Sequence, residues 1–200
     1  MTTVYAFDFD GTVTTRDTLL LFIRHVFGLP RMVLGFALNL PWLFLMRLGL
    51  YDNGKTKQRV FSHFFRGMTE QRFNDLCRSF AAARRAVLRP EMSALLKRLH
   101  DDRADVVVVS ASVVNWVRPF FPDTTVTVVG TEVEIADGCL TGRFSTPNCY
   151  GGEKVRRLLA VRPHRDSYRL VAYGDSRGDR ELLTFADVAY YKQKTFDPKL

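Results

Sequence analysis

The chain has 200 residues, a hydrophobic content of 46% and a formal net charge of +8. This length and composition predict one globular core with a single insertion. Its three cysteines are odd in number and lack C-x-x-C spacing, which argues against a disulfide framework and a thiolate metal site. The positive charge favours an anionic partner and leaves open whether that partner is a phosphorylated metabolite, a membrane surface or nucleic acid.

The first predicted element is a buried strand over residues 4–7, which ends in Asp8, Asp10 and Gly11. No basic segment of a secretory signal precedes this strand, so we expect a cytoplasmic protein. Open α/β sheets bind ligands at the carboxyl ends of their strands, and Gly11 permits a sharp turn there. The two carboxylates are therefore a candidate active centre, although a strand that merely ends in a polar loop gives the same pattern.

A predicted helix follows, capped by Asp17 and Thr18 and ended by Gly28, Leu29 and Pro30. Residues 32–46 are the most apolar part of the chain and carry no charge between Arg31 and Arg47. The stretch is shorter than the roughly 20 residues of a membrane span, so we expect a helical hairpin or a kinked helix. Burial inside a small helical domain and a surface that contacts lipid both stay open, and the basic flanks and Trp42 fit the second.

Three further helical pieces are predicted over residues 60–65, 73–83 and 92–99. The basic residues before the first piece, Lys55, Lys57 and Arg59, are interpreted as a solvated helix face. The continuous run Val106–Val109 then predicts a strand buried on both faces, which ends in Ser110 and Ala111. A helix over residues 113–120 would present its positive end to a phosphate near Ser110, although serine in such a place is also a common helix cap.

The last third of the chain predicts a strand over 125–129 and a β-hairpin, 131–135 and 139–144, around Asp137 and Gly138. Lys154 lies in the first turn of a predicted helix, where a positive charge is electrostatically out of place. The strand 170–173 delivers Asp175 at its carboxyl end, four residues before Asp179. A helix through Leu182, a strand over 188–191 and a tail over 192–200 complete the chain.

Four motifs occur in a chemically complementary order: D-F-D-G-T-V-T, V-V-V-V-S-A-S, G-G-E-K-V and Y-G-D-S-R-G-D. Hydrolysis of a phosphate monoester needs a nucleophile, a metal, a cation that holds phosphate oxygens and an acid for the leaving group. On these motifs the sequence resembles the haloacid dehalogenase superfamily, in its phosphoserine-phosphatase-like branch, subfamily IB. The resemblance covers nearly the whole chain.

The resemblance implies a role for each residue of the motifs. Asp8 is the expected nucleophile, which forms an aspartyl-phosphate, and Asp10 is the expected general acid and base. Mg²⁺ is the expected cofactor, held by the carboxylates of Asp8 and Asp175 and the main-chain carbonyl of Asp10. The expected phosphate-binding residues, and then the supporting ones, are Ser110, Ala111, Lys154 and Gly11, followed by Asp179 and Asn148.

The resemblance also implies an α/β fold. We expect a Rossmann-like three-layer core with a parallel sheet, formed by residues 1–14 and 87–200, and a helical cap inserted at residues 15–86. The cap would choose the substrate, with Asp17 and Arg24 as candidate specificity residues. Its apolar stretch departs from phosphoserine phosphatases and is similar to branch members that dephosphorylate phosphatidylglycerophosphate.

The sequence thus predicts a Mg²⁺-dependent phosphomonoester hydrolase that acts on a small phosphorylated metabolite or a lipid phosphate. Peripheral contact of the apolar cap with a membrane is part of this expectation. The alternative is a non-catalytic phosphate- or membrane-binding module that retained the fold. Nucleic acid is not an expected partner, because the sequence contains no recognisable binding module or basic-aromatic ladder.

Overall fold

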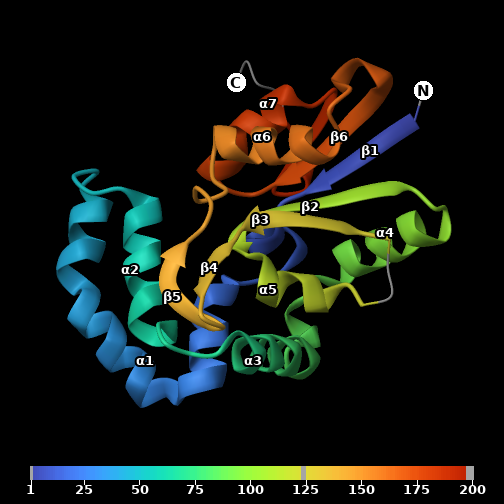
Figure 1. Cartoon of the computed structure of the whole chain (residues 1–200). Helices are drawn as coiled ribbons and strands as arrows, with labels where there is room; N and C mark the ends of the chain where they lie inside the picture. Colours follow the sequence, from blue (N-terminus) through green and yellow to red (C-terminus); the bar gives the residue numbers. More distant parts are fainter. Residues whose placement is uncertain (1, 123–124, 197–200) are drawn as a thin grey trace.

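A six-stranded sheet forms the centre of the computed structural model, which describes residues 2–122 and 125–196 (Figure 1). Its strand order is β3-β2-β1-β6-β7-β8, and all neighbours are parallel except β7 and β8. The strands are β1 (Thr2–Phe7), β2 (Asp105–Val113), β3 (Thr127–Thr131), β6 (Tyr168–Gly174), β7 (Val188–Tyr191) and β8 (Lys194–Thr195). The central strand β1 therefore lies between β2 and β6, and the carboxyl ends of these three strands meet at one edge.

Helices cover both faces of the sheet. The β-branched run of β2 sends Val106 and Val108 into one hydrophobic cluster and Val107 and Val109 into another, as strand alternation requires. The first cluster lies under α4 (Pro90–Asp101) and α5 (Val114–Val117), and the second under α6 (Gly152–Val161) and α7 (Arg180–Phe185). Short helical turns occupy residues 85–87, 118–120, 165–167 and 177–179. This three-layer α/β arrangement confirms the predicted fold class.

Three helices lie between β1 and α4 in the sequence and pack together beside the sheet (Figure 1). They are α1 (Thr18–Arg47), α2 (Asn53–Phe65) and α3 (Glu70–Ala83), and we call them the cap. Their aromatic core of Phe22, Phe65 and Phe73 is continuous with the α4 and α5 side of the sheet. The chain leaves and re-enters the sheet domain side by side, since Thr15 N donates to the carbonyl of Val87 at 2.9 Å. The predicted boundary at residues 15–86 stays a prediction.

Helix α1 shows that the apolar stretch 32–46 is the second part of one long, kinked helix rather than a hairpin. Gly28 breaks the helical geometry with φ of 75° and ψ of 170°, where a residue with a side chain would be strained. From Thr18 to Arg47 the helix is long and apolar enough to cross a membrane by length and composition, with a mean hydropathy of 1.5 in its most apolar window. The helix that contains residues 32–46 is therefore longer than this charge-free stretch, from which its length was predicted.

The cap is tied to the predicted β-hairpin, which consists of β4 (Val133–Ala136) and β5 (Cys139–Phe144). Its turn has positive φ at both Asp137, 50°, and Gly138, 73°, as an Asp-Gly hairpin turn requires. The main chain between α2 and α3 bonds to β5, with Leu140 N donating to the carbonyl of Met68 at 2.8 Å. The hairpin therefore connects the cap with the sheet domain.

Three sequence predictions need correction. Strand β2 continues through Ser110 to Val113, so the predicted helix 113–120 shrinks to the four residues of α5 and a short 3₁₀ turn. Ser110 lies within this strand, which rules out the alternative that it caps a helix. The predicted tail begins with β8, which pairs with β7; residues 197–200 lie outside the described part of the chain.

Candidate active site

Asp8 and Asp10 lie on a tight turn directly after β1. Residues 9–13 form a turn that is closed by a hydrogen bond from Thr14 N to the carbonyl of Phe9 at 2.9 Å, and Gly11 within it adopts φ of 83°. A Cβ atom at Gly11 would lie 2.2 Å from Oδ2 of Asp175, so the close approach of these two loops requires glycine. Thr12 Oγ1 donates to Oδ1 of Asp175 at 3.3 Å. The turn thus places the acids after β1 against the acid after β6.

Lys154 is buried between two carboxylates. Its Nζ donates to Oδ1 of Asp8 and to Oδ1 of Asp179, both at 2.5 Å, and its side chain is only 2% exposed. Burial disfavours the lysine charge, but the attraction of the two carboxylates outweighs it and raises the pKa of Lys154. The lysine that is out of place at a helix start is therefore stabilised by partners from two other segments.

The two carboxylates respond differently to this environment. Burial raises the pKa of Asp8 to about 7, although the contact with Lys154 acts in the opposite direction. Asp179 is as deeply buried, but Lys154 and the hydrogen bonds from Ser176 outweigh burial and lower its pKa. Its second oxygen accepts hydrogen bonds from Ser176 N, at 2.9 Å, and Ser176 Oγ, at 2.7 Å. Asp179 is thus a fixed anion, whereas Asp8 can change its charge near neutral pH.

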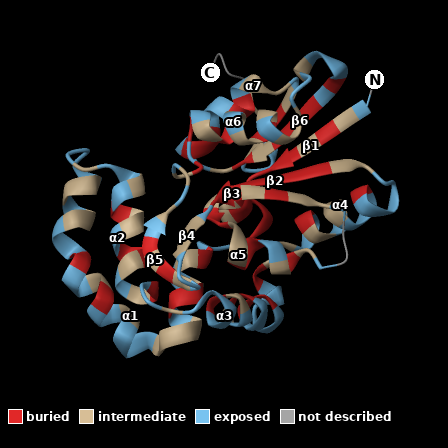
Figure 2. Cartoon of the chain, viewed as in Figure 1, coloured by how far each residue is buried: buried red, intermediate tan, exposed pale blue. Residues whose placement is uncertain are grey.

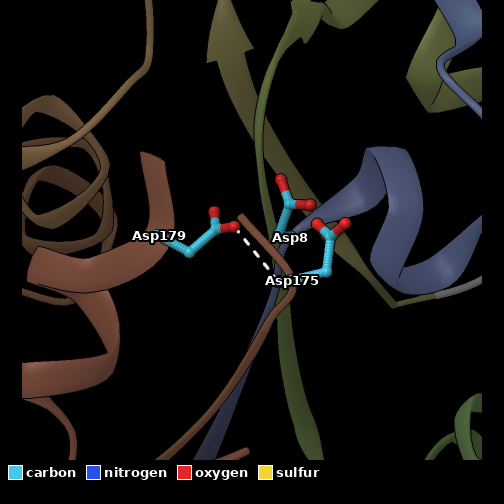
Figure 3. Close-up of side chains that lie close together, drawn as sticks. All are labelled: Asp8, Asp175 and Asp179. Atoms are coloured by element: carbon cyan, nitrogen blue, oxygen red, sulfur yellow. Dashed lines mark hydrogen bonds between the residues drawn. The ribbon is translucent and has the colours of Figure 1, made fainter. Parts of the chain in front are cut away.

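Three carboxylates gather at the ends of β1 and β6 (Figure 3). One oxygen each from Asp8, Asp175 and Asp179 lies within 4.8 Å of the others. Asp179 also accepts a hydrogen bond from the main-chain N of Asp175 at 3.2 Å, which is the dashed line in Figure 3. Hard carboxylate oxygens in this arrangement suit Mg²⁺. Since both oxygens of Asp179 already accept hydrogen bonds, Asp8 and Asp175 are better suited as ligands.

Asp10 connects the end of β2 with the start of the cap. Its Oδ1 accepts hydrogen bonds from Thr18 N, at 2.7 Å, and Thr18 Oγ1, at 2.6 Å, and its Oδ2 accepts one from Ser112 Oγ at 2.5 Å. Neither the orientation of Asp10 by Thr18 nor a role for Ser112 was predicted from the sequence. Ser112 lies two residues beyond Ser110, and the alternation of side chains along a strand is a signal that could have identified it.

A cavity of about 370 Å³ lies between this cluster and the cap. Its polar floor includes Asp8, Asp10 and Lys154, and its other polar lining includes Asp17, Lys57 and Asn148. Apolar side chains of the cap form the opposite wall, namely Leu19, Leu20, Phe36, Leu43, Met46 and Val60. A larger hollow of about 740 Å³ beside α3 and α5 contains none of the predicted site residues.

Lys57 belongs to this site and is not the solvated residue that the sequence analysis expected. It reaches from α2 across the cavity and donates from Nζ to the carbonyl of Ala111 at 2.7 Å. Burial lowers the pKa of Lys57, while Asp10 and Asp17 partly offset this effect. Lys57 shares a helix face with the buried residues Val60 and Phe61, three and four positions further on. This spacing indicates that Lys57 faces the sheet domain and not solvent.

The other predicted site residues differ in whether they line the cavity. Ser110 is buried, and its Oγ accepts a hydrogen bond from Ser112 N at 3.0 Å. Asp17 caps α1 by accepting from Leu19 N at 2.8 Å and lines the cavity, as do Ala111 and Asn148. Arg24 is exposed on α1 and does not line it. Gly11 lines a smaller adjoining hollow together with Asp175.

Comparisons with known proteins place this geometry in context. A family model described as haloacid dehalogenase-like hydrolase matches residues 5–184. Protein CicA of Caulobacter vibrioides is 34% identical over 191 residues, which cover 94% of this chain and 84% of that protein.

Similar folds occur among solved structures. A protein of unknown function from Bordetella pertussis Tohama I has a TM-score of 0.82 and 17% identity, covering 96% of this chain and 90% of its own. A probable phosphoserine phosphatase from Vibrio cholerae has a TM-score of 0.72 and 16% identity, covering 96% of this chain and 56% of its own. At these identities the likeness concerns the fold.

Proposed function

Because the chain belongs to the haloacid dehalogenase-like hydrolase family, we propose that it is a Mg²⁺-dependent phosphomonoester hydrolase that forms an aspartyl-phosphate. The observation that supports this best is the buried Lys154 between Asp8 and Asp179, at the floor of a cavity that also contains Asp10. A phosphate dianion on this floor meets a nucleophile, a fixed ammonium group and a proton-transfer group together.

In the proposed first step, a carboxylate oxygen of Asp8 attacks phosphorus and the ester P–O bond breaks. Asp10 gives a proton to the leaving alkoxide. In the second step, Asp10 takes a proton from water, whose oxygen attacks phosphorus and releases inorganic phosphate and the Asp8 carboxylate. The hydrogen bonds from Thr18 and Ser112 fix the orientation of Asp10 for both transfers.

Lys154 balances the negative charge of Asp8 and of the phosphate, and Asp179 holds the lysine in place. Asp8 and Asp175, with the main-chain carbonyl of Asp10, would hold Mg²⁺, in keeping with the oxygen donors of this cluster. When bound, the ion supplies charge neutralisation at the phosphate oxygens. Ser110 and Ala111, in the last part of β2, are the proposed partners of the remaining phosphate oxygens.

The lining of the cavity favours a lipid phosphate over a small polar metabolite. A phosphate on the floor leaves its organic group against Leu20, Phe36 and Leu43 of α1. Burying apolar groups there is worth about 0.8 kcal/mol per methylene. The proposal therefore includes an enzyme that works at a membrane surface, where such substrates reside.

The first test uses an aryl phosphate with the wild type and Asp8→Asn. This change keeps the size of the side chain but removes the nucleophile, so we expect turnover to fall by at least about a thousandfold. Circular dichroism checks the fold, and EDTA followed by Mg²⁺ checks the metal. Retained turnover in Asp8→Asn would show that Asp8 is not the nucleophile.

The substrate class is tested with a panel of short-chain phosphatidic acids, lysophosphatidic acids, isoprenyl phosphates and phosphorylated sugars and amino acids. We expect kcat/KM to rise with the length of the apolar group up to the size of the cavity. Higher values for phosphoserine or sugar phosphates than for all lipid phosphates would contradict the lipid assignment and leave the hydrolase proposal intact.

A further inference from the structure

The outer face of α1 is apolar and exposed to solvent. Between Arg31 and Arg47, five large apolar side chains are more than half exposed, for example Leu38 at 62% and Phe44 at 64%. The other three are Val33, Leu34 and Leu40, and Leu29, just before Arg31, is 48% exposed. Figure 2 shows that exposed residues recur along α1 between half-buried and buried ones. A continuous apolar face of this kind marks an interaction surface.

The inner face of the same helix is already occupied, so the outer residues cannot turn inward. Gly35 packs so closely on α2 that a Cβ atom would lie 2.2 Å from Cζ of Phe64. Phe36 contacts the Phe64 ring at a centroid distance of 6.2 Å. Asn39, the polar residue of the stretch, is buried and donates to the carbonyl of Gly35 at 2.8 Å. These contacts determine which face of α1 is exposed to solvent.

Charges at both ends of the face indicate what covers it. Arg31 and Arg47 are exposed, and residues 32–46 between them carry no charge, in a chain of net charge +8. An apolar helix face with arginines at its ends is complementary to a bilayer that has acyl chains below anionic headgroups. Trp42 does not take part, because it packs against Tyr51 and lies under the guanidinium of Arg59 at 4.1 Å.

Helix α1 also lies next to the catalytic cavity. Leu43 and Met46 alternate with the exposed residues of the helix and line the apolar wall of the cavity. Leu20 belongs both to this wall and to the exposed apolar residues. The outer face and the cavity wall are therefore two sides of one helix.

We propose that the outer face of α1 docks on an anionic lipid bilayer, with the helix lying along the membrane surface rather than across it. A spanning α1 conflicts with the hydrogen bonds of Thr18 to Asp10 and with the packing of Gly35 and Phe36 on Phe64 of α2. Docking would carry the cavity to the lipid headgroups, so that a lipid phosphate enters along α1. This last step rests on the proposed function, whereas docking itself does not.

The test is flotation of the full chain with vesicles of phosphatidylcholine alone and with one quarter of phosphatidylglycerol. We expect the protein to float with the anionic vesicles. The triple change Leu34→Gln, Leu38→Gln and Phe44→Gln alters exposed residues that do not line the cavity. We expect it to weaken vesicle partitioning at least about tenfold, because each buried methylene contributes to binding, and to leave aryl phosphate turnover unchanged.

A matched pair of charge variants tests the role of the arginines. Arg31→Gln with Arg47→Gln lowers the net charge by two at the ends of the face, and Arg72→Gln with Arg169→Gln lowers it equally at exposed positions on α3 and β6. We expect the first pair to weaken anionic vesicle binding severalfold more than the second, since surface potential acts close to the membrane. Equal losses would overturn the placement of the docking face.

Three other results would overturn the proposal. The first is wild-type protein that hydrolyses the aryl phosphate but does not float. The second is a wild-type dimer, seen by sedimentation, that the triple change makes monomeric without any vesicle binding; the face would then belong to a second copy of the chain. The third is protein that stays with the vesicles in alkaline carbonate, as a spanning helix does. Flotation of Asp8→Asn separates docking from catalysis, since it requires no turnover.

Discussion

The floor of the cavity and the outer face of α1 reverse the usual distribution of residues in a protein. On the floor, charged groups are buried: Lys154 is 2% exposed and Asp179 is fully buried. On α1, large apolar side chains such as Phe44 face solvent. Both arrangements cost free energy in an isolated soluble chain, because charge is favoured in water and apolar surface is favoured out of it.

The difference between the two regions lies in their partners. Every charged group of the floor has a partner within the chain, and none of the described buried side-chain polar atoms lacks a hydrogen bond. The outer face of α1 lacks such cover. Groups paired inside the chain can perform a reaction in any surroundings, whereas an uncovered apolar face depends on what the chain meets. The proposed reaction therefore depends on the floor, and the proposed membrane contact depends on the outer face of α1.

The largest expected effect breaks the pairing on the floor. Lys154→Met leaves Asp8 and Asp179 buried without a cation, so we expect a loss of about 3–5 kcal/mol in the free energy of unfolding. Urea denaturation at pH 8 measures it. Lys97→Met is the control, because its ion pair with Asp101 is exposed, and such pairs contribute about 0–1 kcal/mol. Equal losses of unfolding free energy in Lys154→Met and Lys97→Met would show that the buried pairing on the floor stabilises the chain no more than an exposed ion pair does.

The second prediction separates the cap from the sheet domain. Gly35→Ala forces a Cβ atom against Phe64, so we expect a loss of about 1–3 kcal/mol confined to the cap. Hydrogen exchange should show faster opening of the amides of α1 and α2 than of β1. A Cβ atom at Gly152 would meet no neighbour, which makes Gly152→Ala the control. Uniform acceleration over the whole chain would mean that cap and sheet unfold as one unit.

The third prediction concerns the residue that crosses from one region to the other. Lys57→Gln removes an ammonium group that the cap contributes to the cavity, so we expect kcat/KM for an aryl phosphate to fall about tenfold, chiefly through KM. Lys55→Gln, two residues earlier and exposed, should have no effect. Equal kcat/KM values for the two variants would show that Lys57 does not contribute to substrate binding.

The smallest effect concerns the charge of Asp8. Its raised pKa of about 7 means that protons compete with a metal below neutral pH, so Mg²⁺ affinity should rise with pH. For one proton, the expected gain between pH 6.5 and pH 8 is about fourfold. Titration calorimetry measures it, with the triple glutamine variant of α1 as the control that should give the same slope. A pH-independent affinity would show that Asp8 is already ionised.

Most of the site could be predicted because strand ends are local features. A β-branched or apolar run followed by a polar residue predicts a strand with a functional side chain near its carboxyl end. This pattern placed Asp8, Ser110 and Asp175 at one edge of the sheet. Lys57 could not be placed in this way. Its contact with Ala111 joins residues 54 positions apart, and only the packing of α2 on the sheet brings them together.

The sequence by itself determined the order of the catalytic motifs and the parallel α/β sheet, since both depend on residue type and short-range periodicity. It also showed that residues 32–46 carry no charge. Only the tertiary structure decided which side of that stretch faces solvent, because α2 covers one side of α1 through Gly35 and Phe64 and leaves the other side bare. Periodicity describes the faces of a helix, but the neighbours of the helix decide which face is buried.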